Sequence, residues 1–319
     1  MITCKGRNIL PIFFFFSASV HAWTLSVGEF QFDPVAQDVY VMHGPLTEPS
    51  KANRGFMNNP GFVETANGIV LIDPGSTLEV GKQVLNEIAR VTQKPVIAVF
   101  NTHIHGDHWL GNQAISLAFP SVDIYAHENM IKQANGSEGL NWLDIMNTMT
   151  EGLSAGTDIV APGNSVDHMQ TVEIDGEHFR IHSFLPTHTD TDIMIEHVES
   201  RSLFLGDNCV IDRMSRFRDS SSILGVIKIL EYVAARDFEV LVPGHGPSGP
   251  SEKSLQPYLD YLLKLRRLVE EGFENDMEDY EIKEAAIDQF PEMLDWTGFE
   301  ERFGVNVNKM YLEIEEKEL

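Results

Sequence analysis

Three histidines and one aspartate stand within six residues in the segment His103-Ile104-His105-Gly106-Asp107-His108. Imidazole is the commonest metal ligand among side chains, and carboxylate oxygens also bind divalent ions. His103 and His105 are two residues apart, so in an extended segment they project to the same side and can share one ion. Asp107 and His108 follow Gly106, whose missing Cβ lets the backbone turn toward a second ion. The segment therefore predicts a metal site.

Three further donors lie near the ends of expected strands. His188 follows a strand expected over 179–184, Asp207 ends the apolar run 203–207, and His245 lies between two glycines after another apolar run. A catalytic zinc takes three protein ligands and keeps one position open, so the first histidine pair needs a donor of this kind. Nitrogen and oxygen donors favour zinc, with iron and manganese as alternatives. The predicted metal ligands are His103, His105, Asp107, His108, His188, Asp207 and His245.

The elements before this cluster would deliver it to the edge of a sheet. Residues 38–42 read as a strand, and 61–73 as a hairpin around Ala66-Asn67-Gly68. Ser76 and Glu79 form a capping-box pattern for a helix over 77–91. Residues 95–100 are a continuous apolar run, typical of a buried strand, that leads directly into His103.

After the cluster, the same kinds of element return. Residues 108–152 indicate helices broken at Pro120 and Gly136, with a short strand near 122–125. The later pattern predicts hairpins over 171–185 and 193–205, a helix over 223–235, a strand over 238–242 and helices after 251. Two rounds of strands with helices predict an α/β fold in which two similar sheets stack face to face with helices outside.

Residues 39–250 resemble the metallo-β-lactamase superfamily. The resemblance rests on the strand ending in Asp73, the His-x-His-x-Asp-His segment, His188, the Phe-x-Gly-Asp segment at Asp207 and the Gly-His-Gly at His245. It implies a four-layer αββα sandwich and two Zn²⁺ ions, with Asp73 behind the ligands, where it would hold a ligand in place or anchor a loop. The implied ligand sets are His103, His105 and His188 for the first metal and Asp107, His108 and His245 for the second, with Asp207 bridging them.

The chemistry that this resemblance implies is hydrolysis by a metal-bridging hydroxide, because two adjacent dications lower the pKa of a shared water. Asp107 would also be catalytic, by orienting the hydroxide and relaying its proton. The predicted function is a binuclear zinc hydrolase that cleaves an ester, thioester, lactone or amide of a small molecule. A β-lactamase is one alternative, although β-lactamases of this family usually carry Cys or Ser at the position of Asp207. A mononuclear iron persulfide dioxygenase and a non-catalytic metal carrier are the others.

A second resemblance is to periplasmic metallo-hydrolases associated with quinoprotein dehydrogenases and sulfur oxidation. It rests on Asp38-Val39-Tyr40-Val41 at the start and on Asn306-Val307, Tyr311 and Glu313 at the end. It implies that the tail belongs to the architecture of this subfamily and covers the core or a partner. The predicted organisation is therefore a signal peptide over 1–22, a catalytic domain over 23–250 and a C-terminal helical extension over 251–319.

The first residues indicate export. Lys5 and Arg7 precede the apolar run 9–16, and a small-residue stretch ends at Ala22, the pattern of a cleaved signal peptide. The expected location is therefore periplasmic or secreted. The formal charge of −25 would repel nucleic acid and anionic membranes, so neither is an expected partner. Cleavage would remove Cys4 and leave Cys209 without a disulfide partner.

Three segments are candidates for the wall of the substrate pocket: residues 44–60, the helical segment 142–153, and residues 208–218. The last of them contains Arg213, Arg216 and Arg218. An arginine run in an acidic protein favours surface ion pairs over a substrate-binding role. Cys209 in the same segment is expected to be a buried or near-site thiol and not a ligand.

Overall fold

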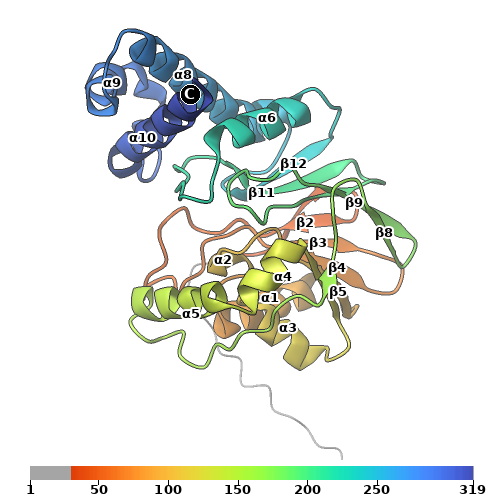
Figure 1. Cartoon of the computed structure of the whole chain (residues 1–319). Coiled ribbons are helices and arrows are strands. Elements are labelled where there is room, and N and C mark those ends of the chain that lie inside the picture. The colour runs from red at the N-terminus through yellow and green to blue at the C-terminus, as the bar shows by residue number, and fades with distance from the viewer. Residues whose placement is uncertain (1–29, 319) are drawn as a thin grey trace, which may run out of the picture.

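Two β-sheets face each other and helices cover both outer faces in the computed structural model, which describes residues 30–318 (Figure 1). The predicted signal peptide and Cys4 lie outside these residues. The two sheets pack through one layer of apolar side chains, which alternate along each strand. Representative members of this inter-sheet core are Val70, Phe100, Phe179, Ile195 and Phe204.

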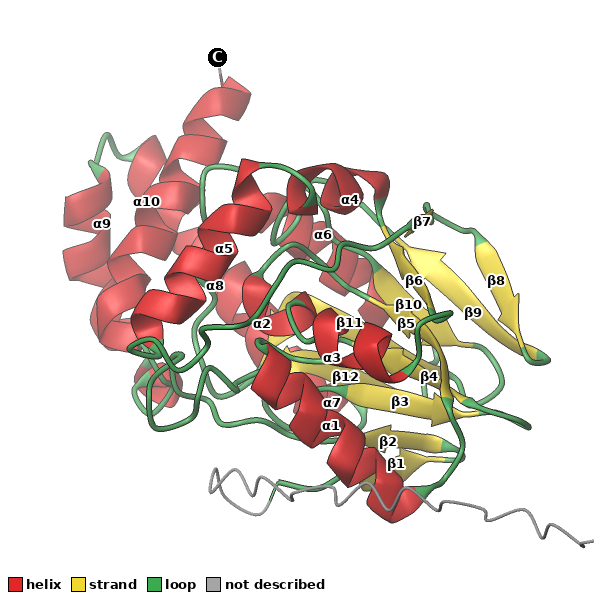
Figure 2. Ribbon diagram, turned by 90° about the horizontal axis from the view of Figure 1, so that it is seen from below, coloured by secondary structure: helices red, strands yellow, loops and turns green. Residues whose placement is uncertain are grey.

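The first sheet has seven strands in sequence order (Figure 2). The strands from β1 to β4 pair antiparallel, and those from β4 to β7 pair parallel. All four residues of the central strand β4 are buried, which matches its continuous run of apolar residues. The strands are β1 (Asp33–Ala36), β2 (Val39–Val41), β3 (Gly61–Glu64), β4 (Ile69–Ile72), β5 (Val96–Phe100), β6 (Asp123–Ala126) and β7 (Asn164–Ser165).

The second sheet has five strands in the order β12-β11-β10-β9-β8. Only the pair β11 and β12 is parallel, and the remaining neighbours are antiparallel. The hairpins predicted around Asp175 and Arg201 are confirmed, since both residues lie between paired strands with positive φ. The strands are β8 (Thr171–Ile174), β9 (Glu177–His182), β10 (Met194–His197), β11 (Ser202–Val210) and β12 (Val240–His245).

Helices from the first half of the described chain cover the first sheet. The core between α1 and this sheet contains Val80, Val84 and Leu71. The capping-box prediction was wrong by one residue, because Thr77 is the N-cap and accepts the amide of Val80, whereas the Ser76 hydroxyl has no hydrogen-bond partner. These helices are α1 (Leu78–Val91), α2 (Gly106–Trp109), α3 (Asn112–Ala118), α4 (Glu128–Ala134) and α5 (Ser137–Met149).

The second sheet is covered by α6 and by the helices after residue 250. One apolar cluster includes Leu230 of α6, Leu241 of β12, Tyr258 of α8 and Phe303 of α10. The four-layer α/β fold and its C-terminal helical region are thereby confirmed. None of the described helices is long and apolar enough to cross a membrane. The helices are α6 (Ile223–Ala234), α7 (Ser251–Ser254), α8 (Gln256–Glu274), α9 (Asp279–Ala286), η1 (Ile287–Gln289), η2 (Pro291–Met293) and α10 (Phe299–Glu318).

The last helix is fastened to the rest of the fold by polar contacts. The Glu313 carboxylate of α10 accepts the amides of Ile223 and Leu224 at 2.9 and 3.0 Å, and the Ser222 hydroxyl at 3.0 Å. A carboxylate in this position satisfies free amides at the start of α6 and favours its dipole. Asn306 is buried and donates to the Tyr261 hydroxyl at 3.0 Å. Asn306 and Glu313, two of the four residues of the tail motif, therefore hold helices together.

Asp175 joins the turns of two hairpins from different sheets. Its carboxylate accepts the Thr65 hydroxyl at 2.7 Å, the Asn67 amide at 2.6 Å and the Asn67 side chain at 2.8 Å. These hydrogen bonds to the Asn67 side chain, the Asn67 amide and Thr65 hold the pKa of Asp175 below its ordinary value of 3.8.

Replacing Asp175 with alanine is expected to lower the midpoint of thermal unfolding near pH 7. The ionised carboxylate stabilises the folded state above pH 3.8, and this contribution is lost as the pH falls through the lower pKa of the folded protein. The difference in unfolding midpoint between the wild-type protein and Asp175→Ala, measured by circular dichroism, should shrink only below about pH 4. Asp288→Ala, which removes an exposed acid on η1, is the control. A difference that stayed constant in strong acid would exclude ionisation of Asp175 as its cause.

Candidate metal centre

The structure brings all seven predicted ligands together at one end of the paired sheets. His103 and His105 follow β5, and α2 carries Asp107 and His108. The remaining three come from the second sheet: His188 from the loop after β9, Asp207 from β11 and His245 from the end of β12.

Two details of this placement differ from the sequence prediction. Asp207 does not end its strand, because β11 continues to Val210. A bulge at Gly206, which has φ of 53°, shifts the register with β12 next to Asp207. Gly106 has no positive φ, and it begins α2. Its small size matters instead because an added Cβ would lie 3.1 Å from Trp142.

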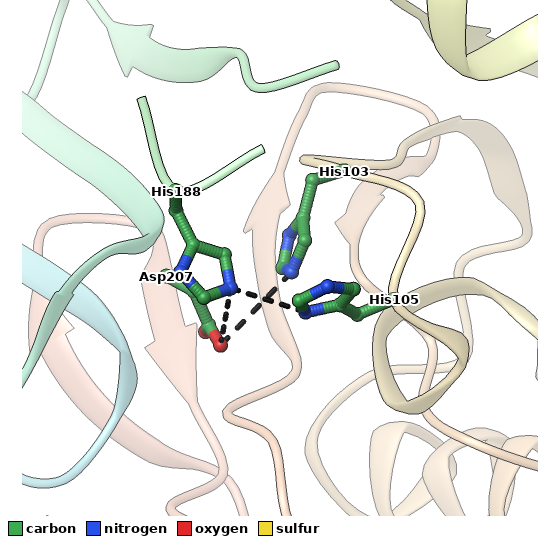
Figure 3. A group of neighbouring side chains, drawn as sticks. All are labelled: His103, His105, His188 and Asp207. Carbon is green, nitrogen blue, oxygen red and sulfur yellow. Dashed lines mark hydrogen bonds and ion pairs between the residues drawn. The ribbon is translucent and has the colours of Figure 1, made fainter. Parts of the chain in front are cut away.

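His103, His105, His188 and Asp207 form the first ligand group (Figure 3). One donor atom from each lies within 4.8 Å of the others, and all four side chains are buried. The Nε2 of His188 is 3.1 Å from the Nδ1 of His105 and 3.5 Å from Asp207 Oδ2. His103 Nε2 lies 4.0 Å from the same oxygen. The four donors thus surround one point.

Asp107, His108 and His245 form the second ligand group. Asp107 Oδ2 lies 3.4 Å from the Nε2 atoms of both His108 and His245. Asp207 takes part here through its other oxygen, since Oδ1 lies 3.2 Å from His108 Nε2 and 3.3 Å from His245 Nε2. One carboxylate therefore presents an oxygen to each group.

The donor set fits metal ions better than it fits hydrogen bonding alone. The buried atoms His103 Nε2, His108 Nε2 and Asp207 Oδ1 have no hydrogen-bond partner, which is costly unless another species occupies the site. Zinc bonds of 2.0–2.1 Å in a tetrahedron place neighbouring donors about 3.3 Å apart, close to most of the distances above. Burial lowers the pKa of His103 and His105 well below their usual range and that of His188 to about 4. These imidazoles are therefore neutral, as metal ligands must be.

Residues around the ligands fix the orientation of their rings. Asp73 Oδ2 lies 2.7 Å from His108 Nδ1 and accepts the Thr102 hydroxyl at 2.6 Å. His245 Nδ1 lies 2.8 Å from the Met57 carbonyl oxygen. An acceptor on the outer nitrogen leaves Nε2 free to face a metal. Asp73 thus lies outside the two ligand groups and holds one of their members.

The sequence model of one protein family, the metallo-beta-lactamase superfamily, matches residues 53–245, which is more than half of the chain. The chain belongs to this superfamily. The matched segment contains both ligand groups.

Among curated proteins, this superfamily member is similar to a linear primary-alkylsulfatase from Pseudomonas sp. (strain ATCC 19151). The two are 30% identical over 74 residues, which is 22% of this chain and 14% of the relative. The chain therefore matches only a small part of that relative's length.

Two solved structures illustrate the shared fold. The metallo-beta-lactamase from Pontibacter korlensis is 18% identical, with a TM-score of 0.56 over 74% of this chain and 99% of the other. The inverting sec-alkylsulfatase Pisa1 from Pseudomonas sp. is also 18% identical, with a TM-score of 0.68 over 89% of this chain and 50% of the other. The larger share of the chain matched by Pisa1 extends the similarity beyond the lactamase-like part.

The absence of a side chain at Gly244 leaves room for the carboxylate of Asp207. Gly244 lies on β12 directly beside Asp207, and an added Cβ would clash with Asp207 Oδ1. Since Oδ1 faces the second ligand group, any larger residue at 244 would displace it. The Gly-His-Gly signal in the sequence therefore has a steric cause.

A cavity of about 380 Å³ opens onto both ligand groups. All three segments that were expected to line it contribute, through residues such as Glu48, Trp142 of α5 and Arg218. Arg302 of α10 also lines the cavity, and no local pattern in the sequence pointed to it.

The expectation of surface ion pairs was wrong for Arg213, which is not at the surface, and Arg216 is exposed but has no carboxylate within 4.0 Å among residues 30–318. Arg213 is buried and pairs with Glu48 at 3.1 Å, and it lines the cavity together with Arg216 and Arg218. Cys209 is buried and donates to the Ser254 carbonyl at 3.3 Å, and burial raises the pKa of its thiol. Its expected role as a buried thiol is thus consistent with its position, and it belongs to neither ligand group.

Proposed function

We propose that this protein is a hydrolase that uses two zinc ions to cleave an ester, thioester, lactone or amide of a small molecule. The observation that carries the proposal is the pair of adjacent ligand groups that share Asp207. His103, His105 and His188 would hold the first ion, and Asp107, His108 and His245 the second. Two bound dications would polarise the bond that breaks and make water a nucleophile near neutral pH.

Residues of the chain would orient the reactants. Asp107 lines the cavity and directs Oδ2 at His108 and His245, which leaves Oδ1 to accept a proton from the attacking water. The carboxylate of Asp207 would keep the two ions together. Trp142 packs against His105 with ring centroids 4.8 Å apart and would exclude water from one side of the site.

A sulfate ester is a second candidate substrate. The relatives named above include two alkylsulfatases, and the arginine side chains on the cavity favour a reacting group with negative charge. A β-lactam has less support, since Asp207 occupies a position that is usually Cys or Ser in β-lactamases of this family. We also propose that the chain is exported to the periplasm or beyond, on the strength of the residues before Trp23.

Metal analysis combined with turnover tests the proposal. Mass spectrometry should find about two zinc ions per chain, and removal by a chelator should lower ester or sulfate-ester hydrolysis at least about tenfold until zinc is restored. Nitrocefin, a lactone, a thioester and an alkyl sulfate would be compared as substrates. One iron per chain would favour the oxygenase, and bound metal without any turnover would favour a metal carrier.

A further inference from the structure

Four arginine side chains line the cavity, although the chain as a whole has a formal charge of −25. Two of them are already paired, because Arg213 and Arg302 both contact the Glu48 carboxylate. Arg216 and Arg218 have no carboxylate within 4.0 Å among residues 30–318. Apart from Glu48 and the predicted metal ligands, Asp144 is the one acid among residues 30–318 that lines the cavity, and it is exposed. Outside the predicted metal ligands, the wall therefore has four arginines against two carboxylates, those of Glu48 and Asp144.

Arg218 is held beside the first ligand group. Its guanidinium lies 5.0 Å from the centroid of the Trp142 ring, the same ring that packs against His105. Its backbone amide donates to the Ser221 hydroxyl at 2.8 Å, and this hydroxyl donates to the His188 carbonyl at 2.7 Å. The segment that carries Arg218 is thus tied to a predicted metal ligand.

The guanidinium itself retains capacity for a ligand. Arg218 Nε is buried and has no hydrogen-bond partner, although leaving a buried donor unsatisfied is costly. A guanidinium that stacks on an aromatic ring still presents its N–H groups in the plane of the fork, where they match the oxygens of a carboxylate or sulfate.

Much of the remaining wall of the cavity is apolar and rich in methionine. Met57, Met146, Met149 and Met214 line it together with Ile145 and Val210. Methionine side chains are flexible and polarizable, so such a wall adapts to chains of different shape. An alkyl chain could therefore lie next to the arginines.

We propose that the cavity binds an amphiphilic anion, in which Arg218 holds a carboxylate or sulfate group and the methionine wall holds an alkyl chain. This inference rests on the proposed function, because the bound molecule would be the substrate of the same metal centre. It narrows the substrate class from neutral esters and amides to molecules that carry one negative group next to an apolar chain.

Binding of octane-1-sulfonate tests the proposal without any turnover, because its carbon–sulfur bond is not hydrolysed. Calorimetric titration of the zinc-loaded protein should show binding, and octan-1-ol should bind much more weakly. Arg218→Met should weaken sulfonate binding about tenfold or more, whereas Arg218→Lys should restore part of the affinity. Arg267→Met removes an exposed arginine of α8 and should leave the affinity unchanged. Equal affinity of the wild-type protein and Arg218→Met would overturn the proposal.

Kinetics with three substrates identify which group of the substrate bears the charge. The substrates are octyl sulfate, a nitrophenyl ester with a terminal carboxylate, and a neutral nitrophenyl ester of equal chain length. For Arg218→Met, the ratio of kcat/KM for the preferred anion to kcat/KM for the neutral ester should fall about tenfold. If this ratio falls for octyl sulfate, Arg218 binds a charge on the reacting group. If it falls for the carboxylate ester, Arg218 binds a charge on a group remote from the bond that breaks.

Failure of the proposed hydrolase function and failure of the proposed anion site give different results. Sulfonate binding that depends on Arg218, without hydrolysis of any substrate, would contradict the proposed function and leave the anion site intact. Hydrolysis of neutral and anionic esters with the same kcat/KM, unaffected by Arg218→Met, would contradict the anion site and leave the hydrolase intact. Thermal unfolding of Arg218→Met establishes that the variant is folded in both measurements.

Discussion

Asp207→Ala is expected to lower hydrolytic turnover on the order of a thousandfold, beyond the roughly 10–100-fold that residues around metal ligands contribute. The reason is that Asp207 presents one oxygen to each ligand group, at 3.5 Å from His188 and 3.2 Å from His108. Its loss would remove a carboxylate oxygen from each group. Turnover of the best substrate and zinc content per chain are the two measurements, and zinc content should fall below two.

Asp219→Ala provides the control, because Asp219 is an exposed acid in the same region and belongs to neither ligand group. It should keep both zinc ions and full turnover. Circular dichroism should show the same fold for both variants. Full turnover of a folded Asp207→Ala protein would contradict the bridging role of this residue.

A chain that ends at residue 250 is expected not to fold. The helices after residue 250 share one apolar core with α6 and β12, to which Tyr258, Leu262, Phe303 and Met310 contribute fully buried side chains. Burial of each such side chain stabilises by about 1.5–3 kcal/mol, so these four alone approach the total stability of about 5–15 kcal/mol that is usual for a folded protein. Chemical denaturation followed by circular dichroism should show no cooperative transition for the shortened chain.

A chain that ends at Glu316 is the control, since it keeps Ile314, the last buried residue of α10. It should unfold cooperatively, with a midpoint close to that of the full chain. Phe303→Ala, a milder change, should lower the free energy of unfolding by about 3–5 kcal/mol. A cooperative transition in the chain that ends at residue 250 would show instead that the tail is a separate unit.

The sequence predicted those parts of the metal centre that depend on short segments. His103, His105, Asp107 and His108 lie within six residues, so one strand and one short helix are enough to place them together. His188, Asp207 and His245 were inferred from their positions near strand ends, and the pairing of β11 with β12 brings the last two together. The layered fold followed from the alternation of apolar runs and helical patterns.

The parts that the sequence did not predict depend on contacts between distant segments. Arg302 reaches the cavity only because α10 folds back toward Glu48, which lies 254 residues earlier. The local charge pattern assigned Arg213 to the surface, since no pattern in the sequence indicates that its segment turns toward the predicted metal ligands and buries it. The sequence also did not predict that Thr77, and not Ser76, is the N-cap of α1. Both side chains can cap a helix, and the path of the backbone decides which of them does.

The cap that Glu313 provides for α6 relates this fold to the order of protein synthesis. The amides of Ile223 and Leu224 leave the ribosome first, and the carboxylate that receives them is made 90 residues after Ile223. Until then, the start of α6 lacks these acceptors, and its apolar face lacks the cover of α8 and α10. A nascent chain that stops between these points therefore presents a substrate for chaperones and proteases.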